Sequence, residues 1–95
     1  MSHLICRITA ASLAGPMTLD LSFDDGTRQI VDLALALRGG LYRKLRDPNF
    51  FAKFAVDPDS GTVVWPNGAD FDPALLHDWP ELGPKFTAMA QNWPL

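Results

Sequence analysis

Two pairs of neighbouring carboxylates have the spacing best suited to acid–base chemistry: Asp24 with Asp25, and Asp70 with Asp72. Catalysis by such a pair needs one carboxyl group in an apolar pocket, where it keeps its proton near neutral pH while the other stays ionised. Both pairs adjoin Gly or Pro, which favours surface turns, and a surface turn does not raise a pKa. No Ser or Cys occupies a recognisable nucleophile turn, and no Gly-rich phosphate loop is present. The sequence therefore predicts no catalytic residues.

The segment from Asp57 to Gly68 has part of the spacing of a calcium-binding loop. Asp57 and Asp59 stand where the first two ligands of such a loop would stand. The loop also needs an oxygen ligand at its fifth position, which is Gly61 here, and a bidentate Glu at its twelfth, which is Gly68. Because two ligand positions fail, we interpret these acidic residues as part of a hairpin turn.

Imidazole and thiol groups are few, namely His3, Cys6 and His77, and no two of them have the spacing of a zinc site. We expect His77 to lie on the solvent side of a helix over residues 72–79. The sequence therefore predicts neither a bound metal nor a cofactor. A lone Cys6 cannot form an internal disulfide, which favours a reducing, cytoplasmic location.

Charge is distributed unevenly along the chain. Five of the eight basic residues fall within 16 positions that contain one acid, and the stretch from residue 54 to residue 83 has six acids and no Lys or Arg. Such a separation can steer an oppositely charged partner or a second copy of the chain. The alternative is that both stretches are simply solvated faces. The basic candidates for partner binding are Arg38, Arg43, Lys44, Arg46 and Lys53.

The last part of the chain carries an apolar stripe at helical spacing, formed by Phe86, Met89, Ala90 and Trp93. We expect a tail helix that opens at Gly83-Pro84. An apolar stripe must pack on its own sheet or on another chain, so the helix either completes the core or forms a dimer or partner contact. Phe86, Met89 and Trp93 are therefore the apolar candidates for partner binding.

Length and composition are those of a compact globular domain. The chain has 95 residues, of which 47 % are hydrophobic and 20 % charged, which excludes a disordered or fibrous protein. No apolar run approaches the ~20 residues of a membrane span. The N-terminus lacks the pattern of a signal peptide, so we expect no membrane partner. The net charge of −3 gives no overall positive field for general nucleic-acid binding.

Hydrophobic periodicity predicts two hairpins. Residues 17–23 alternate between apolar and polar, a Gly26 turn follows, and residues 27–31 return. Residues 55–57 and 62–65 form the second hairpin, with Gly61 in its turn. A strand over residues 4–10 precedes both.

Aspartates mark the helix starts. A short helical turn over residues 33–37 follows Asp32. Asp47-Pro48 opens a helix that carries Phe50, Phe51 and Phe54, and Asp72-Pro73 opens another that Pro80 ends. The predicted fold is α+β, with a mainly antiparallel sheet built from two hairpins plus an N-terminal strand, two short helices and a C-terminal tail helix. Residues 1–82 form one domain, and the tail helix of residues 83–95 packs on it or on a partner.

A set of short motifs, taken together, resembles the domain-of-unknown-function-2442 family of small bacterial proteins. The similarity runs from about Leu19 to about Trp79. Its most specific part is the Trp65–Asp70 stretch. The motifs are Phe23-Asp24-Asp25-Gly26, Val31-Asp32-Leu33, Gly39-Gly40-Leu41-Tyr42, Leu45-Arg46-Asp47-Pro48, Val56-Asp57, Gly61-Thr62-Val63-Val64-Trp65-Pro66-Asn67-Gly68-Ala69-Asp70 and Asp72-Pro73.

The resemblance implies a compact α+β domain without an established activity, and it supplies no catalytic residues. Some members of the family carry a helix-turn-helix DNA-binding domain after this one. Others occur beside a second small protein, in an arrangement similar to toxin–antitoxin pairs. The residues given after Trp79 are too few for such a DNA-binding domain, so we do not expect that role from this chain.

The leading hypothesis is a non-enzymatic, cytoplasmic protein-interaction module that pairs with a small protein or with itself. Its basic segment would contact an acidic partner and its tail would make apolar contacts. One alternative is a regulatory nucleic-acid-binding protein that uses Arg43, Lys44 and Arg46, whose affinity would fall steeply with salt. Another is a small enzyme with an unrecognised pocket, which ligand-induced thermal stabilisation would reveal.

Overall fold

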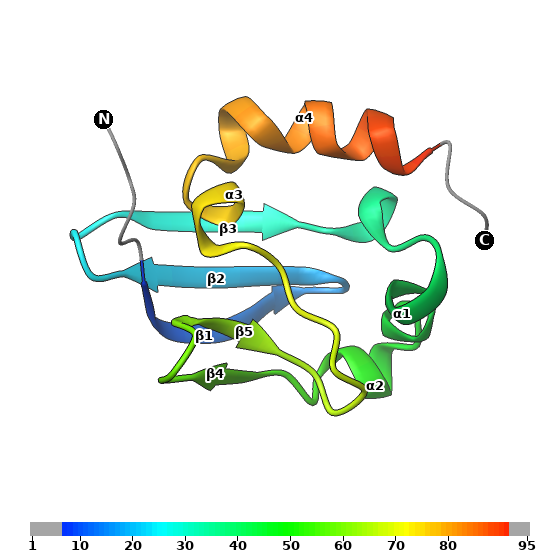
Figure 1. Cartoon of the computed structure of the whole chain (residues 1–95), viewed down its shortest axis with the longest axis horizontal. Helices are drawn as coiled ribbons and strands as arrows, with labels where there is room; N and C mark the ends of the chain where they lie inside the picture. The colour runs from blue at the N-terminus through cyan, green and yellow to red at the C-terminus, as the bar shows by residue number, and fades with distance from the viewer. Residues whose placement is uncertain (1–6, 92–95) are drawn as a thin grey trace.

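The computed structural model describes residues 7–91, and its first layer is a three-stranded antiparallel sheet (Figure 1). Strands β1 (Ile8–Gly15), β2 (Thr18–Phe23) and β3 (Arg28–Asp32) lie in the order β1-β2-β3. The predicted hairpin of residues 17–31 is confirmed, and Gly26 takes the positive φ of +88° that its turn requires. The predicted first strand is displaced. Residues 4–6 lie outside the described residues, and β1 continues to Gly15 although its Ala and Ser residues have low β-propensity.

The second hairpin forms a separate two-stranded sheet of β4 (Ala55–Asp57) and β5 (Thr62–Val64). The prediction of this hairpin is confirmed, including the left-handed Gly61 at φ +71°. The Ile8 N–H donates to the Gly61 carbonyl at 2.8 Å, which connects the second hairpin to the start of β1. The α+β fold with antiparallel hairpins is therefore correct, although the hairpins do not join into one sheet.

Short helices connect the two hairpins. They are η1 (Ala34–Ala36), α1 (Gly40–Arg43), η2 (Lys44–Arg46) and α2 (Pro48–Phe51). The Asp47 side chain caps α2 by accepting the Asn49 N–H at 3.0 Å, as the Asp-Pro pair predicts. Helix α2 ends before Phe54, contrary to expectation. The Phe51 carbonyl, which a longer helix would use, instead accepts the indole N–H of Trp65 at 2.8 Å.

Two helices complete the chain, α3 (Pro73–His77) and α4 (Trp79–Ala90). The expectation that Pro80 ends a helix and Gly83-Pro84 begins the last one is wrong. Helix α4 starts at Trp79, so Pro80 lies in its first turn, where the missing N–H is not needed. Asp78 separates the two helices with φ −101° and ψ +27°. No helix within residues 7–91 is both long enough and apolar enough to cross a membrane.

The core lies between the inner face of the three-stranded sheet, the second hairpin and the helices. Trp65 is its aromatic centre, with ring centroids 5.5 Å from Phe51 and 6.0 Å from Phe71. Phe71 in turn contacts Phe86 of α4 at 6.0 Å. Ala90 of the same helix is fully buried. Of the two expectations for the tail, packing on its own domain is the one observed over the described part of α4.

Candidate functional site

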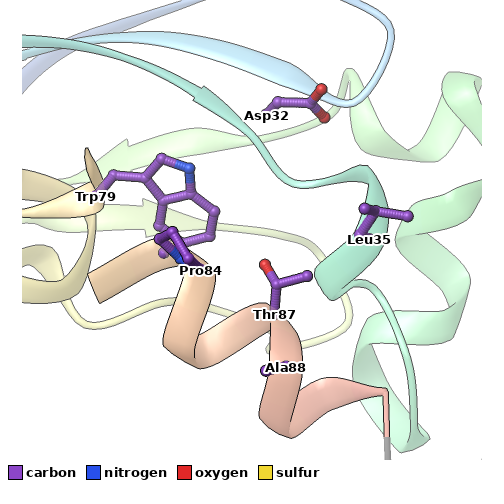
Figure 2. Close-up of a pocket in the computed structure, with 7 residues that line it drawn as sticks. Asp32, Leu35, Trp79, Pro84, Thr87 and Ala88 are labelled. Atoms are coloured by element: carbon purple, nitrogen blue, oxygen red, sulfur yellow. The ribbon is translucent and has the colours of Figure 1, made fainter. Parts of the chain in front are cut away.

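A groove follows one flank of α4, where this helix faces the segment from β3 to η1. Its larger hollow has a volume of about 460 Å³ and is mostly apolar (Figure 2). The wall supplied by α4 includes Pro84, Thr87, Ala88 and Gln91, which the i, i+3, i+4, i+7 spacing places on one helix face. The larger hollow is lined by Asp32, Leu35, Trp79, Gly83, Pro84, Thr87 and Ala88.

The indole of Trp79 fixes one end of the groove. A Cβ atom placed on Gly83 would lie 2.6 Å from two atoms of this indole, so the ring rests directly on the helix backbone. Figure 2 shows the indole beside Pro84, with Asp32 and Leu35 across the hollow. The end of the groove near β3 therefore combines an aromatic ring with one exposed carboxylate, that of Asp32.

Leu35 occupies the middle of the groove, with 68 % of its surface exposed. It lines both the larger hollow and a second hollow of about 140 Å³ that includes Arg38, Arg46 and Gln91. The Gln91 side-chain amide donates to the Leu35 carbonyl at 2.8 Å and holds the end of α4 against η1. We call these two hollows together the α4 groove. It is apolar in the middle, acidic at Asp32 and basic at Arg38 and Arg46.

The structure brings together two of the five predicted basic residues, Arg38 and Arg46, in the second hollow. The other three lie elsewhere. The Lys44 ammonium stands over the Phe50 ring, 5.1 Å from its centroid. Arg43 ends α1, and Lys53 is exposed after α2. Arg38 and Arg46 are therefore the two basic candidates that line the α4 groove.

The apolar candidates in the tail also separate. Phe86 is partly buried and packs against the core. Met89 is 55 % exposed, but the helical period places it on the flank of Leu82 and Phe86, away from the α4 groove. Trp93 lies outside the described residues.

His77 is buried, with 8 % of its surface exposed, and the expectation that it faces solvent is wrong. Its Nδ1 lies 2.7 Å from Asp78 Oδ1 and its Nε2 lies 2.7 Å from Asp25 Oδ2. The Thr27 hydroxyl oxygen is 3.1 Å from Nε2. The β2–β3 turn folds over α3 and covers the imidazole, which Phe23 also contacts edge-on. We call His77 with Asp25 and Asp78 the His77 clasp.

The charges of the clasp favour a protonated imidazole. The hydrogen bond to Asp78 is the largest cause that raises the pKa of His77, with Asp25 adding to it and burial opposing both. The Thr27 backbone N–H, the Thr27 hydroxyl and His77 lower the pKa of Asp25 to about 2. A general base needs a ring nitrogen free to accept a proton, and here carboxylates contact both nitrogens. The clasp therefore serves to hold the β2–β3 turn on α3.

Two further sequence candidates, Asp57 and Asp72, have local structural partners. Asp57 accepts the Asp59 N–H at 3.1 Å and the Ser60 hydroxyl at 2.9 Å, which is the geometry of a turn. Asp72 caps α3 by accepting the Ala74 N–H at 2.9 Å. A search of residues 7–91 for three or more His, Cys, Asp or Glu side chains able to hold a metal ion finds none.

Comparison with known proteins gives one finding. The sequence pattern of a family described as "Protein of unknown function (DUF2442)" matches residues 8–81, which is more than half of the chain. The chain belongs to the DUF2442 family. No curated protein and no solved structure matches it.

The DUF2442 match ends in the first turn of α4, at residue 81. The three residues of the His77 clasp lie inside the matched region, whereas Pro84, Thr87, Ala88 and Gln91 of the groove lie beyond it. Sequence reasoning about this DUF2442 chain found Arg38 and Arg46 but missed Asp32, Leu35 and Trp79 as lining residues. The spacing of Trp79 and Gly83, four residues apart on one helix face, could have indicated the ring-on-backbone contact.

Proposed function

We propose that this chain is a non-enzymatic protein-interaction module of the bacterial cytoplasm that binds a small partner protein in the α4 groove. The observation that carries the proposal is Leu35, a large apolar side chain that is 68 % exposed between two hollows. Burying a leucine side chain contributes about 1.5–3 kcal/mol. A partner that covers Leu35 and fills the larger hollow gains that energy without unfolding any element of the chain.

The charges at the ends of the groove specify the partner segment. Arg38 and Arg46 favour an acidic residue at one end, and the Asp32 carboxylate favours a basic residue at the other. The apolar middle favours one or two large hydrophobic side chains. We therefore infer a short amphipathic segment with an apolar centre and opposite charges at its ends, laid along α4.

Co-purification with matched variants tests the proposal. Wild type, Leu35→Asp and Leu41→Asp are expressed at the endogenous level and recovered at low and high salt. Leu41 is a suitable control because it is also large, apolar and 52 % exposed, but it does not line the groove. We expect one stoichiometric protein with wild type and Leu41→Asp, retained at high salt, and its loss with Leu35→Asp. Recovery of the partner protein in equal amounts with Leu35→Asp and Leu41→Asp contradicts the proposal.

The same preparations distinguish a protein partner from the alternative, a nucleic-acid partner. Contacts to phosphates release counterions, so affinity for an oligonucleotide falls steeply as salt rises. An apolar groove contact changes little over the same range. Recovery of nucleic acid that disappears at high salt, with no protein partner, would replace the proposed function with the nucleic-acid alternative.

A further inference from the structure

The two edge strands of the three-stranded sheet, β1 and β3, have different neighbours. Beside the β3 edge lie α3 and α4, and the Gln29 side chain of β3 donates to the His77 carbonyl at 2.7 Å (Figure 1). Within the described residues β1 pairs with β2 alone, on the opposite side of the sheet. The second hairpin packs against β1 and accepts the Ile8 N–H at its start, whereas Ala10, Ser12, Leu13 and Ala14 are exposed. An edge strand that is open in this way offers backbone donors and acceptors to another strand.

The composition of β1 lacks two of the usual protections of an edge strand, a charged residue and a proline. Its sequence, Ile8–Gly15, contains no charged residue and no proline. Natural edge strands are commonly blocked by an inward-pointing Lys, a proline or a bulge. Here shifts in register occur between Ile8 and Ala10 and between Leu13 and Gly15, so the regular stretch between them is short. Leu13 is 50 % exposed beside an apolar hollow of about 320 Å³ that includes Met17 and Phe51.

We propose that β1 is a self-pairing edge, at which two copies of the chain join antiparallel about a two-fold axis at Ser12 into one six-stranded sheet. In this register Ser12 faces Ser12 of the second copy on the outer face of the sheet. On the inner face, Leu13 of each copy lies opposite Ala11 of the other, because directly opposed residues in an antiparallel pair share a face. The two Leu13 side chains become diagonal neighbours over the apolar hollow.

The features of the strand favour a second copy over an unrelated strand. Because β1 is uncharged, it offers no charge complementarity to a strand of another protein. Antiparallel pairing of β1 with its own copy is two-fold symmetric, and it places no like charges opposite each other. The small Ala11 and the large Leu13 complement each other when the strand meets itself. On the outer face, the Asp20–Arg28 ion pair on β2 and β3 is already formed, so pairing at β1 buries no unpaired charge there.

The area available makes this dimer a weak one. Five residues from each copy and one leucine on each side bury less than the roughly 800 Å² per partner of a standard stable interface. We therefore expect a dimer that forms and dissociates with concentration. Because β1 and β3 are opposite edges, pairing at β1 leaves both α4 grooves open. The dimer would then carry two grooves, and its existence does not depend on the proposed function.

Sedimentation velocity over a concentration series tests the pairing. Ser12→Lys places two like charges opposite each other on the two-fold axis of the dimer. Within one chain, residue 12 lies opposite Asp20 of β2, so we expect a lysine at this position to leave the fold intact. Ser60→Lys, in the exposed turn of the second hairpin, is the matched control. We expect wild type and Ser60→Lys to shift from monomer to dimer with concentration and Ser12→Lys to stay monomeric. A wild type that remains monomeric at about 1 mM overturns the proposal.

Cross-linking tests the register independently of affinity. Ser12→Cys in a Cys6→Ser background brings two thiols opposite each other, within the Cα separation that a disulfide spans. Ser60→Cys in the same background is the control. We expect mild oxidation to produce a covalent dimer with Ser12→Cys in large excess over the control. Equal cross-linking of the two variants overturns the two-fold axis at Ser12, and a dimer that Ser12→Lys does not disrupt overturns the use of β1.

Discussion

Removing the imidazole of the His77 clasp should destabilise the domain and change how its stability depends on pH. The substitution is His77→Leu, which retains an apolar side chain of similar size beside Phe23 but cannot contact Asp25 or Asp78. Two contacts of 2.7 Å to carboxylates are lost, and each hydrogen bond to a charged group is worth about 1.5–3 kcal/mol.

Solvent access to the two carboxylates reduces the combined loss from the two hydrogen bonds. The Asp25 and Asp78 side chains are 44 % and 31 % exposed, so each can regain water when the imidazole is gone. We expect a net loss of about 1.5–3 kcal/mol in the free energy of unfolding, roughly half of the gross value. For a domain of this size, that loss lowers the Tm by about 6–24 °C.

The pH dependence has a definite sign. Because the pKa of His77 is raised in the folded chain, its contribution is complete below the ordinary imidazole pKa and is lost as pH rises through the folded pKa. The pKa of Asp25 is lowered to about 2, so its contribution is present above its ordinary pKa of 3.8 and is lost as pH falls towards 2. The clasp is therefore most stabilising in weak acid, between those two ordinary pKa values.

Urea unfolding of wild type and His77→Leu measures both effects. At about pH 5.5 the two proteins should differ most, and the difference should shrink as pH rises through the raised pKa of His77, because the wild-type imidazole loses its charge there. Asp25→Asn should show a smaller change in the same direction, since it removes one of the two carboxylates. A difference between wild type and His77→Leu that stays constant from pH 5.5 to 9 would refute a charged clasp.

Three further predictions concern local packing, and thermal or urea unfolding measures each. Gly83→Ala should destabilise the chain, because the Cβ of the alanine would lie 2.6 Å from the Trp79 indole. This clash should outweigh the helix propensity of alanine, which is about 1 kcal/mol more favourable than that of glycine. A variant more stable than wild type would contradict the contact. Leu76→Ala should cost about 2–5 kcal/mol, because this side chain is fully buried in the core; a cost below 1 kcal/mol would contradict that burial. Asp72→Ala should cost about 1 kcal/mol through loss of the cap to Ala74, whereas Asp72→Asn should cost less.

The hairpins and helix starts could be predicted from the sequence because their determinants are local. Gly26 and Gly61 occupy turn positions that need positive φ, and each lies within four residues of both strands of its hairpin. The Asp-Pro pairs at Asp47 and Asp72 cap their helices as expected, since the cap bonds reach only two residues ahead. At these positions the local sequence alone determines the turn or the helix cap.

The misplaced elements depend on contacts between distant residues. The sequence of its own helix predicts that His77 faces solvent, but the β2–β3 turn, about fifty residues earlier, covers it. Pro80 can either end a helix or occupy a first turn, and Asp78 decides between the two by interrupting α3. The α4 groove was not predictable because its walls come from η1 and α4, which meet only in the folded chain.

The central claim is that Leu35 and the hollows beside it form the partner-binding surface. The most direct measurement is the Kd of the co-purified partner protein for wild type, Leu35→Asp and Leu41→Asp, each at low and high salt. Loss of the buried leucine contact predicts at least a tenfold weaker Kd for Leu35→Asp at both salt concentrations, with Leu41→Asp within twofold of wild type. A Kd for Leu35→Asp equal to that of wild type would contradict the claim and place the partner on another surface.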